Sequence, residues 1–134
     1  MDKTFSHNVK IYYEDTDSGG VVYYANYLKF IERARTHLIE DLGFSIIFLS
    51  ENYDCHFVVK KIYCNYIKSA KLEDNLLIHT KLLNLKAASF ELEQNIFRDE
   101  VIIFKSKVLI ANVNSLGKPV KIPKTLLSVL SKKI

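Results

Sequence analysis

The sequence is poor in cysteine, which excludes a fold held together by disulfides. Only 2 of its 134 residues are cysteines, and a small disulfide-rich protein needs more. Cys55 and Cys64 are joined by strand-like sequence and differ in parity, so they should point to different faces and not pair. We expect two reduced, mostly buried thiols. Asp54, Cys55 and His56 supply too few ligands to favour a metal site.

Arginine is also scarce, which argues against a nucleic-acid partner. Arg33, Arg35 and Arg98 are the arginines, so 16 of the 19 basic residues are lysines, and these are scattered along the chain. Nucleic-acid surfaces more often cluster arginine and present aromatic side chains for stacking. The net charge of +4 instead fits a small anionic ligand, such as a phosphorylated cofactor.

Long apolar runs are missing as well. No run approaches the roughly 20 residues that span a bilayer, and residues 1–7 contain no apolar signal-peptide region. We therefore expect a cytoplasmic protein without a transmembrane segment. The composition, 49% hydrophobic and 25% charged, is typical of a globular protein, and the length predicts a single domain over residues 1–134.

The spacing of apolar residues changes along the chain from a helical to a strand period. A partly alternating segment at 7–13 predicts a short strand. Steps of three and four residues predict a long helix from Val22 to a stop at Gly43, and 44–52 is compatible with a second short helix. Segments rich in β-branched and aromatic residues predict four strands, and the tail beyond Pro119 predicts a terminal helix. The four strands are 57–68, 76–85, 88–98 and 101–113.

The connections between these segments predict an α+β fold. The connectors at 86–87 and 99–100 are short, and a parallel crossover needs a dozen or more residues, so the strands must form antiparallel hairpins. The one available sheet must cover the apolar face of the long helix. We expect a sheet wrapped around a central helix. Its open edge is a template for pairing with a second copy, so we expect a homodimer or a higher assembly.

The loop before the long helix combines acidic residues with adjacent glycines, Gly19 and Gly20. The first turn of a helix has N–H groups without intrahelical partners and carries a partial positive charge. A carbonyl held there is polarised, and one such donor is worth about 3–4 kcal/mol to an oxyanion. A nearby carboxylate could activate water or attack the carbonyl. Alternatively, Asp15 and Asp17 only cap the turn and the helix; the residues alone leave both roles open.

Residues 9–27, VKIYYEDTDSGGVVYYANY, and 30–35, FIERAR, closely resemble the 4-hydroxybenzoyl-CoA thioesterase family of hotdog-fold enzymes. They are most similar to its Tol–Pal-associated acyl-CoA thioesterases, the YbgC-like branch. The resemblance continues through 57–61 and 67–74 and covers nearly the whole chain. It implies a five-stranded antiparallel sheet around a long helix, assembled as a homodimer or homotetramer. It also implies hydrolysis of acyl-CoA to free acid and CoA, and an association with the Tol–Pal proteins of the cell envelope. No metal or further cofactor is implied, because CoA is part of the substrate.

The resemblance assigns the catalytic roles to two residues of the loop. Asp17 matches the catalytic carboxylate, which acts as nucleophile or general base, and the backbone N–H of Tyr24 matches the group that binds the thioester carbonyl. The YbgC-like branch usually has histidine at position 24, so tyrosine keeps the backbone donor but removes a nearby imidazole. Glu32 lies on the long helix, where some hotdog branches carry a working acid, but it reads here as a surface charge.

Substrate-binding positions also follow from the resemblance. Lysine and serine side chains match positions that bind the CoA phosphates, and one valine pair lies on the strand beside the thioester. Tyr23 and Asn26 belong to the first motif; Asn26 matches its end, where it shapes the loop. The predicted substrate-binding residues are Tyr23, Asn26, Val58, Val59, Lys60, Lys61, Lys86 and Ser89.

Two other functions compete with thioester hydrolysis. A hydroxyacyl dehydratase on the same fold pairs a histidine with an acid, but His56, the one superficial candidate, lacks that family's neighbouring Gly and Pro. A non-catalytic protein that binds acyl-CoA or a cell-envelope partner would have lost turnover, and Tyr24 in place of histidine fits that alternative.

Overall fold

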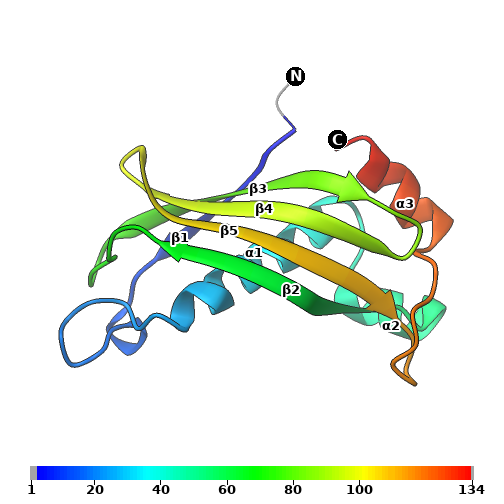
Figure 1. Cartoon of the computed structure of the whole chain (residues 1–134), viewed down its shortest axis with the longest axis horizontal. Helices are drawn as coiled ribbons and strands as arrows, with labels where there is room; N and C mark the ends of the chain where they lie inside the picture. Colours follow the sequence, from blue (N-terminus) through cyan, green and yellow to red (C-terminus); the bar gives the residue numbers. More distant parts are fainter. Residues whose placement is uncertain (1–2, 134) are drawn as a thin grey trace.

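A five-stranded antiparallel sheet curves over one long helix in the computed structural model, which describes residues 3–133 (Figure 1). The strand order is β1-β3-β4-β5-β2, and the predicted α+β architecture is confirmed. The strands are β1 (Phe5–Lys10), β2 (His56–Tyr66), β3 (Asn75–Leu85), β4 (Ser89–Arg98) and β5 (Val101–Val113). The helices are α1 (Asn26–Asp41), α2 (Ile46–Tyr53) and α3 (Lys124–Ser131), with a 3-10 turn, η1, at Tyr13–Asp15.

Helix α1 packs its apolar face against the inner face of the sheet. Phe30, Ile31 and Ala34 are among its buried residues and recur at helical spacing. The helix begins later than its apolar period predicts, because Val22 is still extended and donates its N–H to the carbonyl of Ala70 at 2.9 Å. Its predicted end is confirmed, since Gly43 follows it with a φ of +94°, a conformation that glycine adopts without strain.

The first strand is shorter than the sequence predicts. β1 ends at Lys10, because the Asp15 carboxylate accepts the N–H of Tyr12 at 2.9 Å and draws residues 13–15 into η1. The hairpin strands β3, β4 and β5 lie within one residue of their predicted bounds. A strand with one buried face is predicted most easily, because its apolar and polar residues alternate along the sequence.

Strand β2 is the edge strand next to β5, and its side chains are largely exposed. Val58 is 43% exposed and Val59 46%, so neither is a core residue of the single chain. The prediction of buried thiols holds for Cys55 and is wrong for Cys64, which is exposed on β2. Burial raises the pKa of the Cys55 thiol to about 11, so this thiol stays protonated at neutral pH.

The turn between β4 and β5 carries strain that substitution should relieve. Asp99 and Glu100 link the paired residues Arg98 and Val101, and their φ values are +49° and +67°. Such two-residue turns favour Asn-Gly. We expect the double variant Asp99→Asn, Glu100→Gly to be more stable by about 1 kcal/mol, or roughly 4 °C in Tm. Thermal unfolding tests this, and an unchanged or lower Tm would contradict it.

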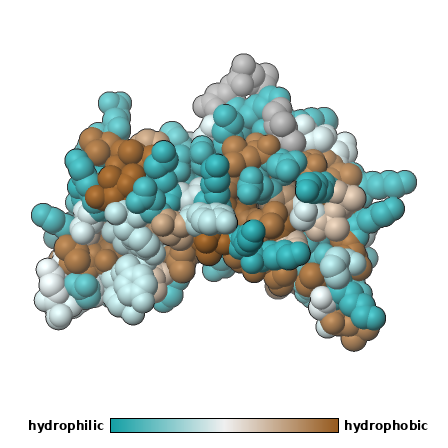
Figure 2. All heavy atoms as spheres, in the orientation of Figure 1, coloured by the Kyte–Doolittle hydropathy of each residue, from teal (hydrophilic) through white to brown (hydrophobic). Residues whose placement is uncertain are grey.

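The outward surface mixes hydrophilic and hydrophobic residues. On the face that Figure 2 shows, hydrophilic side chains spread over the whole view and do not gather in one patch. Within residues 3–133, none of the helices has the length and apolar character needed to cross a bilayer.

Candidate functional site

The loop before α1 folds around Asp17. The backbone N–H of Asp17 donates to the carbonyl of Val21 at 2.8 Å, and the backbone carbonyl of Asp17 accepts the N–H of Gly20 at 3.1 Å. The Asp17 Oδ1 atom accepts the N–H of Gly19 at 2.8 Å. No hydrogen bond within the described chain engages Oδ2. One carboxylate oxygen therefore caps the turn, and the other is available to a ligand.

Asp15 and Asn26 hold this loop against the start of α1. The carbonyl of Asp15 accepts the backbone N–H of Tyr23 at 3.1 Å and the side-chain amide of Asn26 at 2.9 Å. Asn26 is buried, with 9% of its surface exposed. Its amide braces the loop from within, so Asp15 and Asn26 act on the shape of the site.

Tyr24 lies at the entrance to α1, two residues before the first helical residue. Its backbone N–H donates to no acceptor among residues 3–133, and it lies just before the first turn of the helix, whose N–H groups lack intrahelical partners. Its carbonyl accepts the hydroxyl of Tyr66 at 3.0 Å. The Tyr66 ring also makes edge contacts with Tyr27 and Phe104, with ring centroids 5.4 and 5.1 Å apart. The sheet therefore holds the backbone of Tyr24 in place from β2.

Asp17 and Tyr24 line one cleft of about 370 Å³, and Tyr23 shares its wall. A hydrogen bond with the Tyr24 side chain raises the pKa of Tyr23. Burial raises the pKa of Tyr66, so both phenols stay protonated at neutral pH. The remaining lining residues are Val21, Val22, Tyr27, Tyr66, Ile67, Lys68 and Ser69. The lining of the cleft thus brings together the Asp17 carboxylate, the backbone of Tyr24 and neutral tyrosine hydroxyls.

A second cavity of about 430 Å³ brings together three of the predicted substrate-binding residues, Lys60, Lys86 and Ser89. Lys60 and Tyr66 are six residues apart on β2, which is about 20 Å along an extended strand. Val58 and Lys61 line neither this cavity nor the Asp17 cleft, and Val59 lines a third cavity under α1. The predicted residues therefore fall into separate groups along one chain.

Sequence reasoning missed Tyr66, Lys68 and Ser69, which lie in the Asp17 cleft. Lys68 and Ser69 lie in the segment 67–74 that resembles the family, but no site role followed from it, and only the folded sheet brings this segment and the end of β2 to the loop. Glu32 is exposed and lines the third cavity, not the Asp17 cleft. Within residues 3–133, no three His, Cys, Asp or Glu side chains are grouped to hold a metal ion.

Comparison with known proteins gives consistent matches over the chain. The family model of the thioesterase superfamily matches residues 19–103. The acyl-CoA thioesterase YbgC of Haemophilus influenzae is 44% identical over 126 residues, which cover 92% of each chain. The acyl-CoA thioester hydrolase YbgC of Escherichia coli O6:H1 is 37% identical over 92% of this chain and 93% of its own. A probable thioesterase from Bartonella henselae superposes with a TM-score of 0.87 at 35% identity, covering 90% of this chain and 99% of that one.

Proposed function

The chain belongs to the thioesterase superfamily, and from this premise we propose that residues 1–134 form one domain that hydrolyses acyl-CoA thioesters to free acid and CoA. One observation carries the assignment of the site. Asp17, whose Oδ2 has no hydrogen-bond partner among residues 3–133, and Tyr24, whose N–H has none there either, line the same cleft. A carboxylate and an oriented donor are the two groups that acyl transfer needs.

In the proposed mechanism, the N–H of Tyr24 donates to the thioester carbonyl oxygen. This donor stabilises the developing oxyanion by about 3–4 kcal/mol, and the partial positive charge at the start of α1 adds to it. The Asp17 carboxylate then takes one of two roles. It either attacks the carbonyl carbon, giving a mixed anhydride that water cleaves, or removes a proton from the attacking water. In both cases the carbon–sulfur bond breaks and CoA leaves as its thiolate.

The distance between the two groups of site residues points to two copies of the chain. Lys60 and the Tyr66 end of the cleft lie about 20 Å apart on the edge strand β2. Antiparallel pairing of two β2 strands around their midpoint, near Lys61, would place Tyr66 of one copy opposite His56 of the other, and residues 62–65 opposite residues 57–60. We propose a homodimer in which the Asp17 cleft of one copy adjoins the lysine cavity of its partner.

In this dimer, basic and polar side chains hold the CoA phosphates through charge-assisted hydrogen bonds. Lys60, Lys86 and Ser89 share one cavity, and Lys61 lies exposed next to it on β2. Further assembly to a homotetramer and an association with Tol–Pal proteins rest on the family resemblance alone, and a cytoplasmic location rests on the sequence composition.

A hydrolysis screen tests the proposed function. Short, long and aromatic acyl-CoAs are incubated with the purified chain, and a thiol reporter records the release of CoA. We expect catalytic release from at least one class of acyl-CoA. Binding of acyl-CoA without release from any of them would favour the alternative, a non-catalytic acyl-CoA-binding or cell-envelope-associated protein.

We expect Tyr66→Phe to lower kcat more than it changes KM. The substitution removes the hydroxyl that holds the Tyr24 carbonyl at 3.0 Å and keeps the ring. A neutral hydrogen bond of about 0.5–1.5 kcal/mol corresponds to a roughly 2- to 13-fold lower rate. Tyr53→Phe is the control, because Tyr53 lies on α2 away from the proposed interface, is 45% exposed and does not line the cleft. Equal effects of the two substitutions would contradict a positioning role for Tyr66.

A further inference from the structure

A row of buried polar side chains crosses the inner face of the sheet beneath α1. Thr80, Gln94 and Ser106 are in register on β3, β4 and β5, and each is at most 3% exposed. The Gln94 amide donates to the carbonyl of Ile31 at 2.9 Å and to the hydroxyl of Thr80 at 3.0 Å. Burying a polar group costs free energy unless the group is hydrogen-bonded. The side chains of Thr80, Gln94 and Ser106 are all hydrogen-bonded within the protein.

At that end lies Arg35, a partly buried cation. Its Nη1 donates to Oε1 of Gln94 at 3.0 Å, and this is its one hydrogen bond within residues 3–133. No described carboxylate oxygen lies within 4.0 Å of its nitrogens. Glu32, one turn earlier, opposes the lowering of the Arg35 pKa by burial. A guanidinium has five N–H donors, so most of those on Arg35 remain available.

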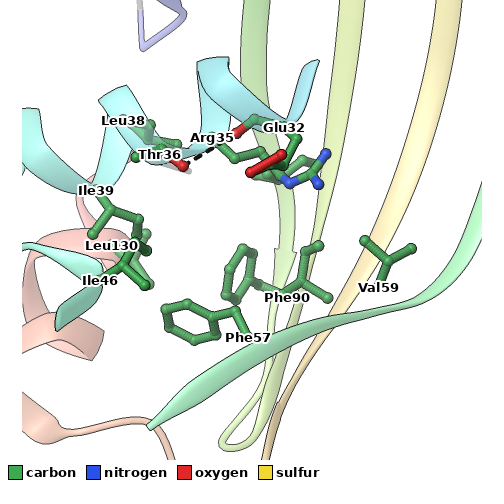
Figure 3. Close-up of a pocket in the computed structure, with 12 residues that line it drawn as sticks. Glu32, Arg35, Thr36, Leu38, Ile39, Ile46, Phe57, Val59, Phe90 and Leu130 are labelled. Atoms are coloured by element: carbon green, nitrogen blue, oxygen red, sulfur yellow. Dashed lines mark hydrogen bonds between the residues drawn. The ribbon is translucent and has the colours of Figure 1, made fainter. Parts of the chain in front are cut away.

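Arg35 lines a cavity of about 180 Å³ between α1 and the sheet. Figure 3 shows Glu32, Arg35 and Thr36 along the helix, with the rings of Phe57 and Phe90 across the open space. The rest of the lining is apolar: Leu38, Ile39, Ile46, Val59, Leu92, Ile110 and Leu130. An apolar cavity of about 150 Å³ holds benzene, so this one accommodates a group of about six carbons or fewer. An occupant that matches the walls has an apolar body and an oxygen that accepts from Arg35.

The cavity is out of reach of the carbonyl site on its own chain. Tyr24 precedes Arg35 by 11 positions, which is roughly 15 Å along a helix and exceeds the length of a short acyl group. Phe57 and Val59, however, belong to β2. The proposed pairing would set Phe57 opposite Asn65 of the second copy and Val59 opposite its Tyr63, so the cavity opens toward the Tyr66 end of that copy.

We propose that this cavity receives the acyl group of a thioester held in the Asp17 cleft of the second copy. Arg35, positioned by Gln94, selects a short acyl group that carries an acceptor oxygen toward its far end. This inference rests on the proposed hydrolase function and homodimer. A site built to bind a substrate oxygen discriminates strongly against the analogue that lacks it, because its own polar groups are then left unpaired.

Four acyl-CoAs of equal carbon number test the inference: butyryl-, 3-hydroxybutyryl-, acetoacetyl- and succinyl-CoA. We expect the wild type to hydrolyse at least one oxygenated acyl-CoA with a kcat/KM about 10-fold or more above that for butyryl-CoA. A preference for 3-hydroxybutyryl- or acetoacetyl-CoA would show that Arg35 selects a neutral acceptor oxygen, and a preference for succinyl-CoA would show that it selects a carboxylate. Arg35→Met should abolish the preference, with a loss of hydrolysis that is about 10-fold or more larger for the oxygenated acyl-CoA than for butyryl-CoA. Arg33→Met, at an exposed position on the same helix, is the matched control.

Two outcomes would overturn the inference: butyryl-CoA hydrolysed as well as the others by the wild type, or an equal loss on all four in Arg35→Met. If Arg35→Met does not fold, the wild-type preference decides alone. Hydrolysis confined to long or aromatic acyl-CoAs would refute this inference and leave the hydrolase function standing. A wild type that hydrolyses no acyl-CoA of any class would contradict the hydrolase function itself.

Discussion

Replacing Asp17 by Asn should lower kcat/KM for acyl-CoA hydrolysis by about 10³-fold or more and leave substrate binding nearly intact. The amide cannot act as nucleophile or general base, and a loss of about 10²–10⁴-fold is typical for such a group. The loop should keep its shape, because the amide oxygen of Asn can still accept the N–H of Gly19 as Oδ1 does at 2.8 Å. Steady-state kinetics with the thiol reporter and acyl-CoA binding to the inactive variant measure the two effects.

Asp15→Asn is the matched control for this substitution. Asp15 lies two residues away, and its carboxylate accepts the N–H of Tyr12 at 2.9 Å. The amide oxygen of Asn at position 15 can accept the same N–H. Asp15 does not line the cleft, so this variant should keep activity within a few-fold of wild type. Equal losses in the two variants would show that these acids act on the loop and not on the substrate. Equally slow hydrolysis by wild type and Asp17→Asn would remove the hydrolase assignment.

The second large effect concerns the edge of the sheet. Ile62 lies near the middle of β2 and is 37% exposed. In the proposed pairing it lies close to its own counterpart, so Ile62→Asp places two like charges across the new strand pair and destabilises it. We expect sedimentation velocity to show a 15.5 kDa monomer in place of a dimer. The kcat/KM for acyl-CoA hydrolysis should fall at least about 100-fold, because each site in the proposed dimer needs residues from both copies.

Val101→Asp is the control for surface charge, since Val101 is 45% exposed at the start of β5. It lies outside the paired edge and should leave both the dimer and the activity unchanged. Circular dichroism and thermal unfolding establish that both variants fold. A folded Ile62→Asp monomer with full activity would contradict a site shared between copies, although the roles of Asp17 and Tyr24 could stand.

The hairpin strands and the long helix are readable from the sequence because their side chains have one buried face. Phe90 and Leu92 alternate with Glu91 and Glu93 along β4, and the structure buries the first pair and leaves the second more accessible. The start of α1 was less predictable. The residues before it are held by long-range bonds such as that from Val22 to Ala70, and no local period contains that information.

The residues of the candidate site were likewise only partly predictable from the sequence. The loop motif identified Asp17 and Tyr24, and the fold brings both into one cleft. Whether Asp17 caps the turn or serves a ligand was open from the sequence; in the structure Oδ1 caps the turn, and Oδ2 has no hydrogen-bond partner among residues 3–133. Tyr66 and the exposure of Val58 and Val59 depend on β2 being the edge strand. Strand order is a property of the whole sheet, which local sequence does not encode.

A crystal structure of the Asp17→Asn variant with bound acyl-CoA is the most direct test of the central claim, that Asp17 and the N–H of Tyr24 act on the same thioester carbonyl. We expect the carbonyl oxygen at 2.7–3.1 Å from the backbone nitrogen of Tyr24. We also expect the side chain at position 17 to face the carbonyl carbon, directly or through one water. A thioester bound with its carbonyl away from the start of α1, and with position 17 turned from it, would contradict the account.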